Sequence, residues 1–384
     1  MKKLKVCSVF GTRPEAIKMA PVALELARRP QIDHKIVVTG QHRAMLDQML
    51  SLFGLKPDID LNIMLDRQTL TQVTTRALEG MERALETISP DIVLVHGDTT
   101  TSFVGALASY YARIPVGHVE AGLRTGDRYN PFPEEMNRAM IDSLADILLA
   151  PTSGARDTLL AENKPPENIF ITGNTVIDAL LLAAEMPAPS ALPDGVPEDA
   201  RIILVETHRR ENLGAPMREI CLGLRDIAEK RSDAHIVFPA HLNPAVQDVA
   251  REILGGLPRA HILPPQDYLP FVSLMKRARL ILTDSGGVQE EAPSLKTPVL
   301  VLRKVTERPE AVAAGAAAVI GPDREKIFSF ASRLLDDEVF YASMTRGSNP
   351  YGDGLASRRI ADFLLYKFNH AQSRPDEFAS PENA

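Results

Sequence analysis

Short runs of apolar and β-branched residues alternate with longer segments of helical periodicity along the whole chain. These runs begin at residues 4, 35, 91, 115, 146 and 168, and the pattern starts afresh with runs at 201, 234, 260, 279 and 298. Such alternation is typical of repeated βαβ units, whose strands lie in parallel sheets. A length of 384 residues also exceeds that of one ordinary domain. We therefore predict an α/β fold with two doubly wound lobes, each with a parallel sheet of five or six strands.

Prolines at positions 187, 189, 193 and 197 mark a loop near the junction of the two lobes, because proline breaks helices and stiffens the chain. Residues 173–186 have a helical pattern that leads into the second lobe, so we place the boundary just before them. The predicted organisation is a first lobe over 1–171, a second lobe over 172–354, a helix over 355–370 that packs back on the first lobe and a flexible tail over 371–384.

The formal net charge of −7 results from 43 basic and 50 acidic residues. This balance argues against binding to nucleic acids and anionic membranes, which need a basic face. No apolar run approaches the ~18 residues of a membrane span, and the first run is too short for a signal peptide. Cys7 and Cys221 have no metal-binding spacing, so neither a disulfide framework nor a zinc site is expected. These features predict a cytoplasmic protein.

Glycine and charged residues follow the first strand, at the sheet edge where ligands bind in doubly wound folds. Gly11 allows a tight turn there, and the following helix points free N–H groups at a ligand. Arg13 and Lys18 add positive charge to this presumed anion site. An ordinary helix start with two solvated cations is the alternative for this motif alone.

The sequence TDSGGVQEE, which directly follows another strand, is a stronger signal. Ser285, Gly286 and Gly287 let backbone N–H groups approach a phosphate, and the start of a helix favours its negative charge. Glu291 could accept hydrogen bonds from a ribose, and Arg308 follows the next strand with another positive charge. A capped turn without phosphate is the alternative, but this combination favours a nucleotide site.

His208 follows the first strand of the second lobe and stands beside Arg209 and Arg210. A histidine can donate to a phosphate or titrate near neutral pH, because its ordinary pKa is ~6.5. Solvated cations that cap a loop are the simpler alternative. Three donors at one strand end favour anion binding.

The first lobe supplies acids at its strand ends instead of cations. Asp98, Glu120 and Glu134 each follow a strand or begin a helix, and Glu135 is adjacent to the last of them. Taken singly, Asp98 is explained as a helix cap and Glu134 as a favourable first-turn acid. Three acids that face a phosphate site in the other lobe predict general acid/base chemistry.

Several common motifs are missing from the chain. GxGxxG and GxxxxGK[ST] are absent, which disfavours NAD and a phosphate-loop ATPase. HExxH and GxSxG are absent too, which disfavours a zinc peptidase and an α/β-hydrolase. We therefore expect neither a metal nor a cofactor.

Nine motifs, taken in order, resemble those of the non-hydrolysing UDP-N-acetylglucosamine 2-epimerases. They are GTRPEAIKMAP at 11, TGQHRAMLDQ at 39, VLVHGDTTT at 93, GHVEAGLRTGD at 117, NPFPEEMNR at 130, ITGNTVIDAL at 171, THRREN at 207, TDSGGVQEEAP at 283 and NPYGDG at 349. The resemblance implies two Rossmann-like lobes of the glycosyltransferase-B-like type, a ligand cleft between them and a homodimer. It also implies cofactor-free interconversion of UDP-GlcNAc and UDP-ManNAc for bacterial surface polysaccharides.

The reaction that the resemblance implies eliminates UDP across C1 and C2 of the sugar and adds it back to 2-acetamidoglucal. Carried over by position, the catalytic residues are Asp98, Glu120, Glu134 and His208, and which acid serves which face of the sugar stays open. The implied substrate contacts are Arg13, Lys18, Ser285, Gly286, Gly287 and Arg308 for the phosphates, Glu291 for the ribose, and Gln266 and Phe271 for the uracil. Core packing is the alternative role for Phe271.

Bacterial members of this family can carry a second UDP-GlcNAc site that activates the enzyme. The resemblance implies Gln41, Arg67, Arg209 and His241 as its lining. Ala44 departs from the family pattern, because many relatives have a longer polar residue there, and this leaves activation open. Glu206 also departs, since smaller or uncharged residues are common before the histidine. An inward-facing acid there would weaken phosphate binding, unless strand alternation turns it away.

Two hypotheses stand beside the epimerase. One is a sugar-nucleotide-dependent glycosyltransferase of the same two-lobed architecture. The other is a non-catalytic UDP-sugar sensor, which would bind the ligand without changing it.

Overall fold

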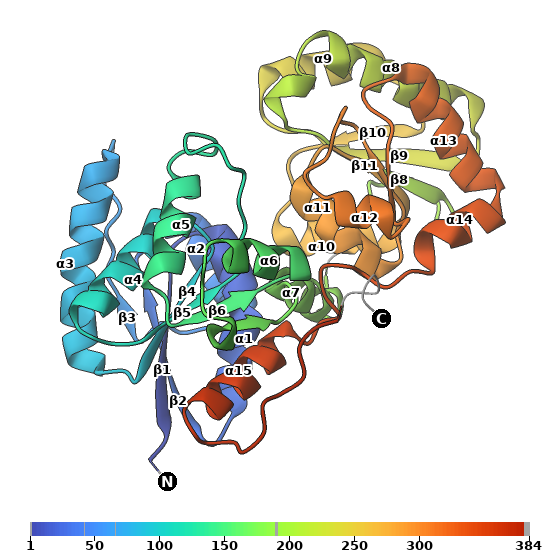
Figure 1. Cartoon of the computed structure of the whole chain (residues 1–384). Coiled ribbons are helices and arrows are strands. Elements are labelled where there is room, and N and C mark those ends of the chain that lie inside the picture. Colours follow the sequence, from blue (N-terminus) through green and yellow to red (C-terminus); the bar gives the residue numbers. More distant parts are fainter. Residues whose placement is uncertain (1, 42, 66, 189–190, 380–384) are drawn as a thin grey trace. The chain divides into compact units, whose positions relative to one another are not determined.

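The computed structural model describes residues 2–41, 43–65, 67–188 and 191–379, and the chain divides into two compact units (Figure 1). The first unit consists of Met1–Ala179 and Tyr351–Ser380, and the second unit of Leu180–Pro350. The division falls inside helix α7 (Thr175–Ala184), later than the predicted boundary after residue 171. The start of α7 belongs to the first unit because Asp178 accepts hydrogen bonds from the backbone of 356–357.

The first unit contains a seven-stranded parallel sheet in the order β3-β2-β1-β4-β5-β6-β7. Its strands are β1 (Leu4–Phe10), β2 (Ile32–Val38), β3 (Ile59–Asp60), β4 (Ile92–His96), β5 (Val116–Val119), β6 (Ile147–Ala150) and β7 (Ile169–Ile171). Its helices are α1 (Arg13–Arg28), α2 (Arg43–Leu52), α3 (Leu70–Ile88), α4 (Thr100–Tyr111), α5 (Glu134–Leu144), α6 (Ser153–Ala161), the short 3₁₀ helix η1 (Pro166–Asn168), the start of α7, and α15 (Ala356–Lys367). The sequence predicted five or six strands, and the additional strand β3 is too short for a recognisable pattern.

Helices cover both faces of this sheet (Figure 1). On one face, Val9 of β1 packs in a buried cluster with Met81 of α3 and Val104 of α4. On the other face lie α1 and α15, and Phe363 of α15 stacks on Phe170 with 4.1 Å between the ring centres. The C-terminal helix thus completes the core of the first unit.

Residues 371–379 pack along the first unit, which differs from the predicted flexible tail. Phe378 is buried, its backbone N–H donates to Ile171 O at 2.9 Å, and the Arg359 guanidinium lies 5.5 Å from its ring centre. A single aromatic anchor creates no periodic pattern, so this contact could not be recognised from the sequence. Residues 380–384, the rest of the predicted tail, lie outside the described part of the chain.

The second unit contains a six-stranded parallel sheet in the order β10-β9-β8-β11-β12-β13. Its strands are β8 (Arg201–Glu206), β9 (Ala234–Pro239), β10 (Ala260–Leu263), β11 (Ala278–Thr283), β12 (Val299–Val301) and β13 (Ala317–Val319). Its helices are α8 (Ala215–Lys230), α9 (Pro244–Leu254), α10 (Tyr268–Arg277), α11 (Gly286–Glu291), α12 (Pro309–Ala313), α13 (Arg324–Asp336), α14 (Glu338–Thr345) and the 3₁₀ helices η2 (Arg210–Asn212) and η3 (Ala292–Leu295). Both sheets are wholly parallel with helices between their strands, which confirms the predicted fold class.

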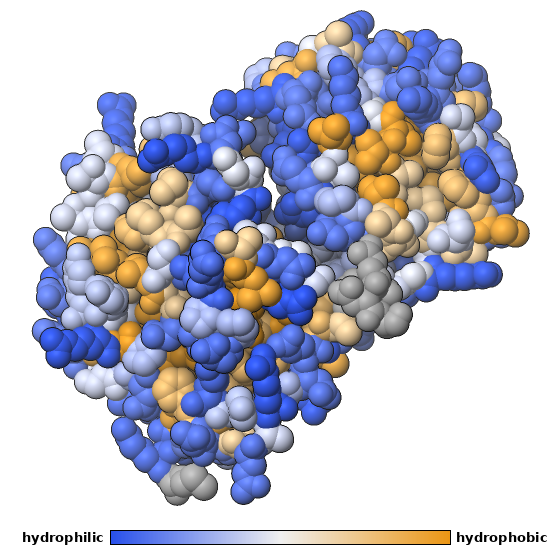
Figure 2. Space-filling view, in the orientation of Figure 1, coloured by the Kyte–Doolittle hydropathy of each residue, from blue (hydrophilic) through white to orange (hydrophobic). Residues whose placement is uncertain are grey.

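Hydrophilic residues cover most of the surface that Figure 2 shows, with apolar groups between them. This distribution fits a chain in which 24% of the residues are charged. Within the described residues, no helix has the length and apolar character needed to cross a membrane.

Candidate active site

Each sheet has one point where the strand order reverses, between β1 and β4 in the first unit and between β8 and β11 in the second. Ligands of doubly wound sheets bind at such points, because the loops after the two strands diverge there and leave room. Each unit therefore has one candidate site. The loops involved are 11–15 and 97–98 in the first unit, and 206–208 and 284–287 in the second.

Asp98 lies directly after β4, in a turn where Gly97 has a φ of 65°. Its backbone oxygen accepts a hydrogen bond of 2.9 Å from Asn137 Nδ2, and its carboxylate is paired with the Arg138 guanidinium. The cap of helix α4 is Thr99, so capping does not explain Asp98. The Asp98 side chain keeps 31% of its surface exposed. Two neighbouring residues of α5 therefore orient this acid without covering it.

Glu120 follows β5 with a φ of 68°, a left-handed conformation that is uncommon for residues other than glycine. Its Oε1 accepts a hydrogen bond of 3.0 Å from Asn174 Nδ2 and is paired with Lys18, while His96 Nε2 lies 3.3 Å from Oε2. A Cβ on Gly97 would lie 3.6 Å from this carboxylate. Glu120 therefore adjoins the turn that carries Asp98.

The environment of Glu120 keeps its carboxylate ionised. Burial would raise the pKa of Glu120, but Lys18 and the other donors outweigh burial and lower it to about 2. Burial lowers the pKa of His96 to about 3, so His96 is neutral at neutral pH. Lys18 is therefore the cation that holds the charge on Glu120. The structure thus shows Lys18 paired with Glu120. Its expected contact with a phosphate stays a prediction.

Glu134 and Glu135 begin helix α5 but have different surroundings. Glu135 is buried and accepts hydrogen bonds of 3.0 Å from the backbone N–H groups of Thr125 and Gly126. Glu134 is only half-buried, and no hydrogen bond or ion pair joins its side chain to the described residues. Of the two acids, Glu135 holds a loop in place, and Glu134 is the one that a substrate could use.

Glu15, to which the sequence analysis assigned no role, joins the two loops of the first site. Its carboxylate accepts hydrogen bonds from Gly11 N at 3.0 Å, Thr12 N at 2.8 Å, Thr99 Oγ1 at 2.6 Å and Ser102 Oγ at 2.7 Å. Burial raises the pKa of Glu15, although these four donors oppose the rise. The predicted tight turn after β1 is thus fastened to the start of α4, beside Asp98.

His118 is a second residue that the sequence analysis missed. Its Nε2 lies 2.7 Å from Gly97 O, which can only accept, so Nε2 carries a proton. Its Nδ1 lies 2.5 Å from Asp142 Oδ1, and Asp142 Oδ2 accepts a hydrogen bond of 3.2 Å from Gly122 N. This buried pair links α5 to the turns after β4 and β5. An alternating strand pattern could not reveal it, because Asp142 lies 24 residues away.

In the second unit, buried Asp284 fastens the loop after β8 to the end of β11. Its Oδ1 accepts a hydrogen bond of 3.0 Å from His208 N, and its Oδ2 accepts from Arg209 N at 3.1 Å and Asn212 Nδ2 at 2.7 Å. In the sequence, Asp284 is recognisable only as part of the TDSGGVQEE motif. Its structural role is to place the histidine loop beside that motif.

The turn that begins α11 leaves fewer backbone donors for a phosphate than the sequence predicted. Ser285 N donates to Thr283 Oγ1 at 2.9 Å, so that N–H group is already used. The N–H groups of Gly286 and Gly287 lie in the first turn of the helix and remain the backbone donors for an anion. Glu291 lies one turn further on, with its Oε1 3.9 Å from a Cβ placed on Gly287.

Arg308 lies beside this turn. A Cβ on Gly286 would be 3.6 Å from the Arg308 guanidinium carbon, and Arg308 Nε donates to buried Glu290. The backbone N–H of Arg308 donates to Thr306 Oγ1 at 3.0 Å, which in turn donates to Gln289 Oε1 at 2.5 Å. Helix α11 therefore positions Arg308, and the structure brings this predicted phosphate contact together with the glycine turn.

His208 stands at the same strand reversal with 37% of its side chain exposed. Its Nδ1 lies 2.6 Å from Glu206 Oε1, and Asp284 Oδ1 lies 3.6 Å from the same nitrogen. The hydrogen bond that His208 Nδ1 donates to Glu206 raises the pKa of His208, although burial opposes the rise. Glu206, which the sequence marked as a departure, thus points at the histidine.

Glu206, His208 and Asp284 are the one group of potential metal ligands that the described residues bring together. Both oxygens of Glu206 are engaged, by His208 Nδ1 and by Thr283 Oγ1 at 2.7 Å. Asp284 accepts three hydrogen bonds, two of them from backbone N–H groups. Each carboxylate oxygen in the group thus has at least one protein partner, so a hydrogen-bond network accounts for this group without a metal ion.

A family model described as UDP-N-acetylglucosamine 2-epimerase matches residues 24–365. A UDP-N-acetylglucosamine 2-epimerase of Bacillus subtilis (strain 168) is 53% identical over 98% of this chain and 99% of its own. The chain belongs to the UDP-N-acetylglucosamine 2-epimerase family. This confirms the resemblance inferred from the nine motifs.

Solved structures of this epimerase family share the fold. A putative UDP-N-acetylglucosamine 2-epimerase from Listeria monocytogenes has a TM-score of 0.93 at 47% identity, covering 98% of this chain and 100% of that one. The enzyme from Neisseria meningitidis, solved bound to UDP-GlcNAc, has a TM-score of 0.81 at 46% identity, covering 94% and 100%. A calicheamicin glycosyltransferase, with a TM-score of 0.58 and 16% identity, shares only the fold with this chain. This likeness agrees with the predicted glycosyltransferase-B-like fold.

The remaining residues predicted from the epimerase resemblance lie at separate places. Arg13 is exposed at the start of α1. Gln266 Nε2 donates to Pro264 O at 2.7 Å, and Phe271 is half-buried in α10. These contacts do not establish what the three residues bind. The phosphate contact of Arg13 and the uracil pocket of Gln266 and Phe271 stay predictions.

The residues predicted for the activator site are divided between the two units. Gln41 and Arg67 belong to the first unit, and Arg209 and His241 to the second. Gln41 Oε1 accepts a hydrogen bond of 3.1 Å from Thr101 Oγ1, beside the first strand reversal. His241 is exposed, and its Nδ1 accepts a hydrogen bond from the backbone. Their grouping into one epimerase activator site stays a prediction.

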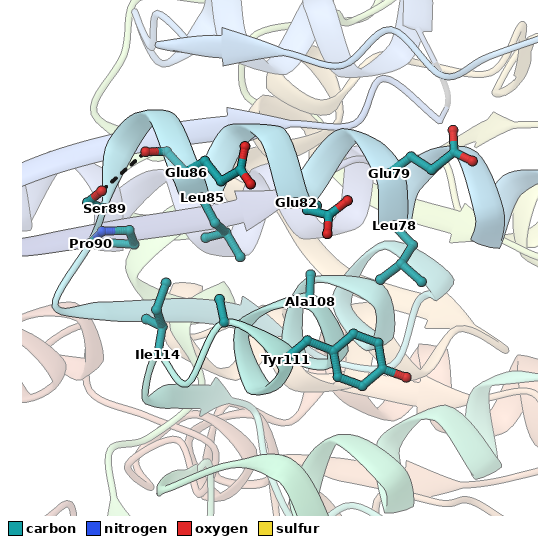
Figure 3. Close-up of a pocket in the computed structure, with 11 residues that line it drawn as sticks. Leu78, Glu79, Glu82, Leu85, Glu86, Ser89, Pro90, Ala108, Tyr111 and Ile114 are labelled. Carbon is teal, nitrogen blue, oxygen red and sulfur yellow. Dashed lines mark hydrogen bonds between the residues drawn. The ribbon is translucent and has the colours of Figure 1, made fainter.

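A surface groove between α3 and α4 lies away from the strand reversal of the first unit (Figure 3). Leu78 and Leu85 of α3 face Tyr111 of α4 across it, and Figure 3 shows acidic side chains along α3. Those acids are Glu79, Glu82 and Glu86, and the lining contains no lysine, arginine or histidine. Three carboxylates without a cation repel a nucleoside diphosphate, so this groove is not the substrate site.

Proposed function

We propose that this chain interconverts UDP-GlcNAc and UDP-ManNAc by inverting C2 of the sugar. The observation that carries the proposal is the pair of carboxylates at the first strand reversal. Glu120 and Asp98 adjoin one turn, yet each is paired with a different cation from another element. Two differently held acids suit a reaction that removes a proton from one face of a carbon and returns one to the other.

The hydrogen at C2 of this sugar is not next to a carbonyl, so simple deprotonation is unfavourable. Elimination avoids the difficulty. A carboxylate takes the C2 proton while the C1–O bond breaks and UDP departs with the bonding electrons, which leaves 2-acetamidoglucal. An acid then returns a proton to the opposite face of C2, and a UDP oxygen forms the C1–O bond again.

The surroundings of the acids limit their roles in this scheme. Glu120 is ionised at neutral pH, so it can accept a proton or stabilise positive charge but cannot begin as the donor. Asp98 and Glu134 are the remaining acids for the donating step. The UDP that departs carries negative charge, which the glycine turn, Arg308 and His208 of the second unit would stabilise.

The test is to incubate the protein with UDP-GlcNAc alone and follow the products by NMR. The proposal expects UDP-ManNAc with no acceptor and no NAD added. Sugar transfer that starts only when an acceptor is supplied would contradict it and favour a glycosyltransferase. Binding of UDP-GlcNAc without any conversion would contradict it in favour of a sensor.

The proposal extends to regulation and physiology. UDP-GlcNAc would also bind an activator site formed by Gln41, Arg67, Arg209 and His241, in a cytoplasmic homodimer that supplies UDP-ManNAc for surface polysaccharides. Gln41 supports this because its amide reaches the edge of the first strand reversal. A lag or a sigmoidal dependence of the rate on UDP-GlcNAc, lost in Gln41→Ala, is the expected result. A hyperbolic dependence of the rate on UDP-GlcNAc in both the wild type and Gln41→Ala would contradict the activator site.

A further inference from the structure

Glu206 is held from two sides at the end of β8. Its Oε1 lies 2.6 Å from His208 Nδ1, and its Oε2 accepts a hydrogen bond of 2.7 Å from Thr283 Oγ1. Thr283 is the residue directly opposite Glu206 in the parallel register of β8 and β11, and it is buried. The position of the carboxylate is therefore fixed by the sheet itself.

This contact determines which nitrogen of His208 carries a proton. A carboxylate oxygen can only accept, so Nδ1 donates to Glu206. Nε2 makes no hydrogen bond within the described part of the chain and is the nitrogen left for a ligand. The charged groups of the described residues that act most strongly on the ring are Glu206, Asp284 and Arg209. Glu206 and Asp284 favour the charged imidazolium, and Arg209 disfavours it.

We infer that Glu206 is a positioning residue that fixes the His208 ring and keeps it charged, so that Nε2–H donates to the diphosphate of the UDP moiety. The inference rests on the proposed function, because it takes UDP as the ligand. The hydrogen bond to Glu206 raises the pKa of His208 above its ordinary value. The histidine therefore remains a charged donor to a higher pH than it would without its partner.

The same geometry reverses the expectation that an acid beside a phosphate site weakens binding. Both oxygens of Glu206 are occupied by protein donors, and the imidazolium compensates its charge. Removal of the carboxylate should therefore weaken UDP binding at pH values where the wild-type histidine is still charged and the histidine of the variant has lost its proton.

The first experiment follows the His208 ring by NMR as the pH is raised, with the signal assigned by its absence in His208→Gln. We expect Glu206→Gln and Glu206→Thr to lose the His208 proton at a lower pH than the wild type, with the threonine variant as a second test should the glutamine variant fold poorly. Glu252→Gln, which removes an exposed carboxylate of the same unit paired with Arg218, should titrate like the wild type. An unchanged His208 midpoint in the Glu206 variants would overturn the inference.

The second experiment measures UDP affinity by calorimetry at pH 6 and at the measured wild-type midpoint of His208. Glu206→Gln should bind UDP like the wild type at pH 6 and severalfold more weakly at the midpoint. Equal weakening at both values would show a merely structural role, and tighter binding would show that Glu206 repels the diphosphate. Either result overturns the inference. A wild type that binds UDP but fails to epimerise UDP-GlcNAc would overturn the proposed function alone, and one that binds no UDP would overturn both.

Discussion

At the first strand reversal, Asp98 and Glu120 are held through side chains that come from other elements. Arg138 of α5 is paired with Asp98, and Lys18 of α1 is paired with Glu120. At the second reversal, the expected phosphate donors are two backbone N–H groups in a turn, those of Gly286 and Gly287, together with the side chains of Arg308 and His208. Asp284, which precedes this turn, accepts hydrogen bonds from two backbone N–H groups of the loop after β8.

The difference indicates a division of labour between the units. Ion pairs from other elements hold the carboxylates of Asp98 and Glu120 in place, and Lys18 also keeps Glu120 ionised, which suits proton transfer. Backbone N–H groups, Arg308 and His208 together supply positive charge for a phosphate. Changes at the first reversal should therefore reduce turnover and spare UDP binding, and changes at the second should do the opposite.

The largest effect is expected from Asp98→Asn, which removes an acid and keeps its shape. Turnover should fall by about 10²–10⁴-fold, the usual contribution of general acid–base catalysis. The Kd for UDP, measured by calorimetry, should stay within about twofold. Unchanged turnover would show that Asp98 is not a catalytic residue. A loss of UDP binding that parallels the loss of turnover would contradict the division of roles between the two units.

Lys18→Met should leave the Glu120 carboxylate, which is only 11% exposed, without its cation. Broken buried ion pairs cost about 3 kcal/mol of unfolding free energy, and turnover should fall as well. Glu120 has a lowered pKa in the folded protein, so its stabilising contribution is complete above the ordinary value of 4.5 and is lost as the pH falls towards about 2. The stability difference from the wild type, measured by urea unfolding, should therefore shrink from pH 7 to pH 3.

Lys2→Met is the matched control, because Lys2 is paired with Asp91 on the exposed surface. It should unfold like the wild type at both pH values. If Lys18→Met instead keeps its stability and loses UDP affinity, the phosphate contact predicted from the sequence is its main role.

Arg308→Gln should act at the second reversal. Loss of one charged donor to the diphosphate should weaken UDP binding by roughly tenfold, with a smaller effect on kcat. Arg308→Lys, which keeps a charge beside Glu290, should bind with intermediate affinity. Arg218→Gln, which removes a surface arginine of the same unit, is the control. Equal UDP affinity in Arg308→Gln and in this control would contradict the assigned phosphate contact.

The smallest effect is expected from Phe378→Ala. The Phe378 ring lies 3.5 Å from a Cβ placed on Gly173, next to Asn174, which donates to Glu120. Loosening this support should lower kcat by about threefold, at the weak end of the ~0.5–2 kcal/mol typical of remote coupling, and should spare UDP binding. A UDP affinity that falls with kcat would show that the segment acts on the second unit as well.

The residues at the strand ends could be predicted from the sequence. Each buried strand is a short apolar run, so the residues that follow it can be identified from the sequence alone. Asp98, Glu120, His208 and Ser285 were found in this way. Their partners could not be found, because Lys18 is 102 residues from Glu120, and only the folded sheet brings the two together. The direction of Glu206 depends in the same way on the register between β8 and β11.

The central claim is that the acids of the first unit exchange the proton at C2 of the sugar. The most direct test is to run the reaction with UDP-GlcNAc in deuterated water and examine C2 of the product by NMR. We predict UDP-ManNAc that carries deuterium at C2, and loss of this exchange in Asp98→Asn while UDP still binds. UDP-ManNAc that retains the original hydrogen at C2 would contradict the account.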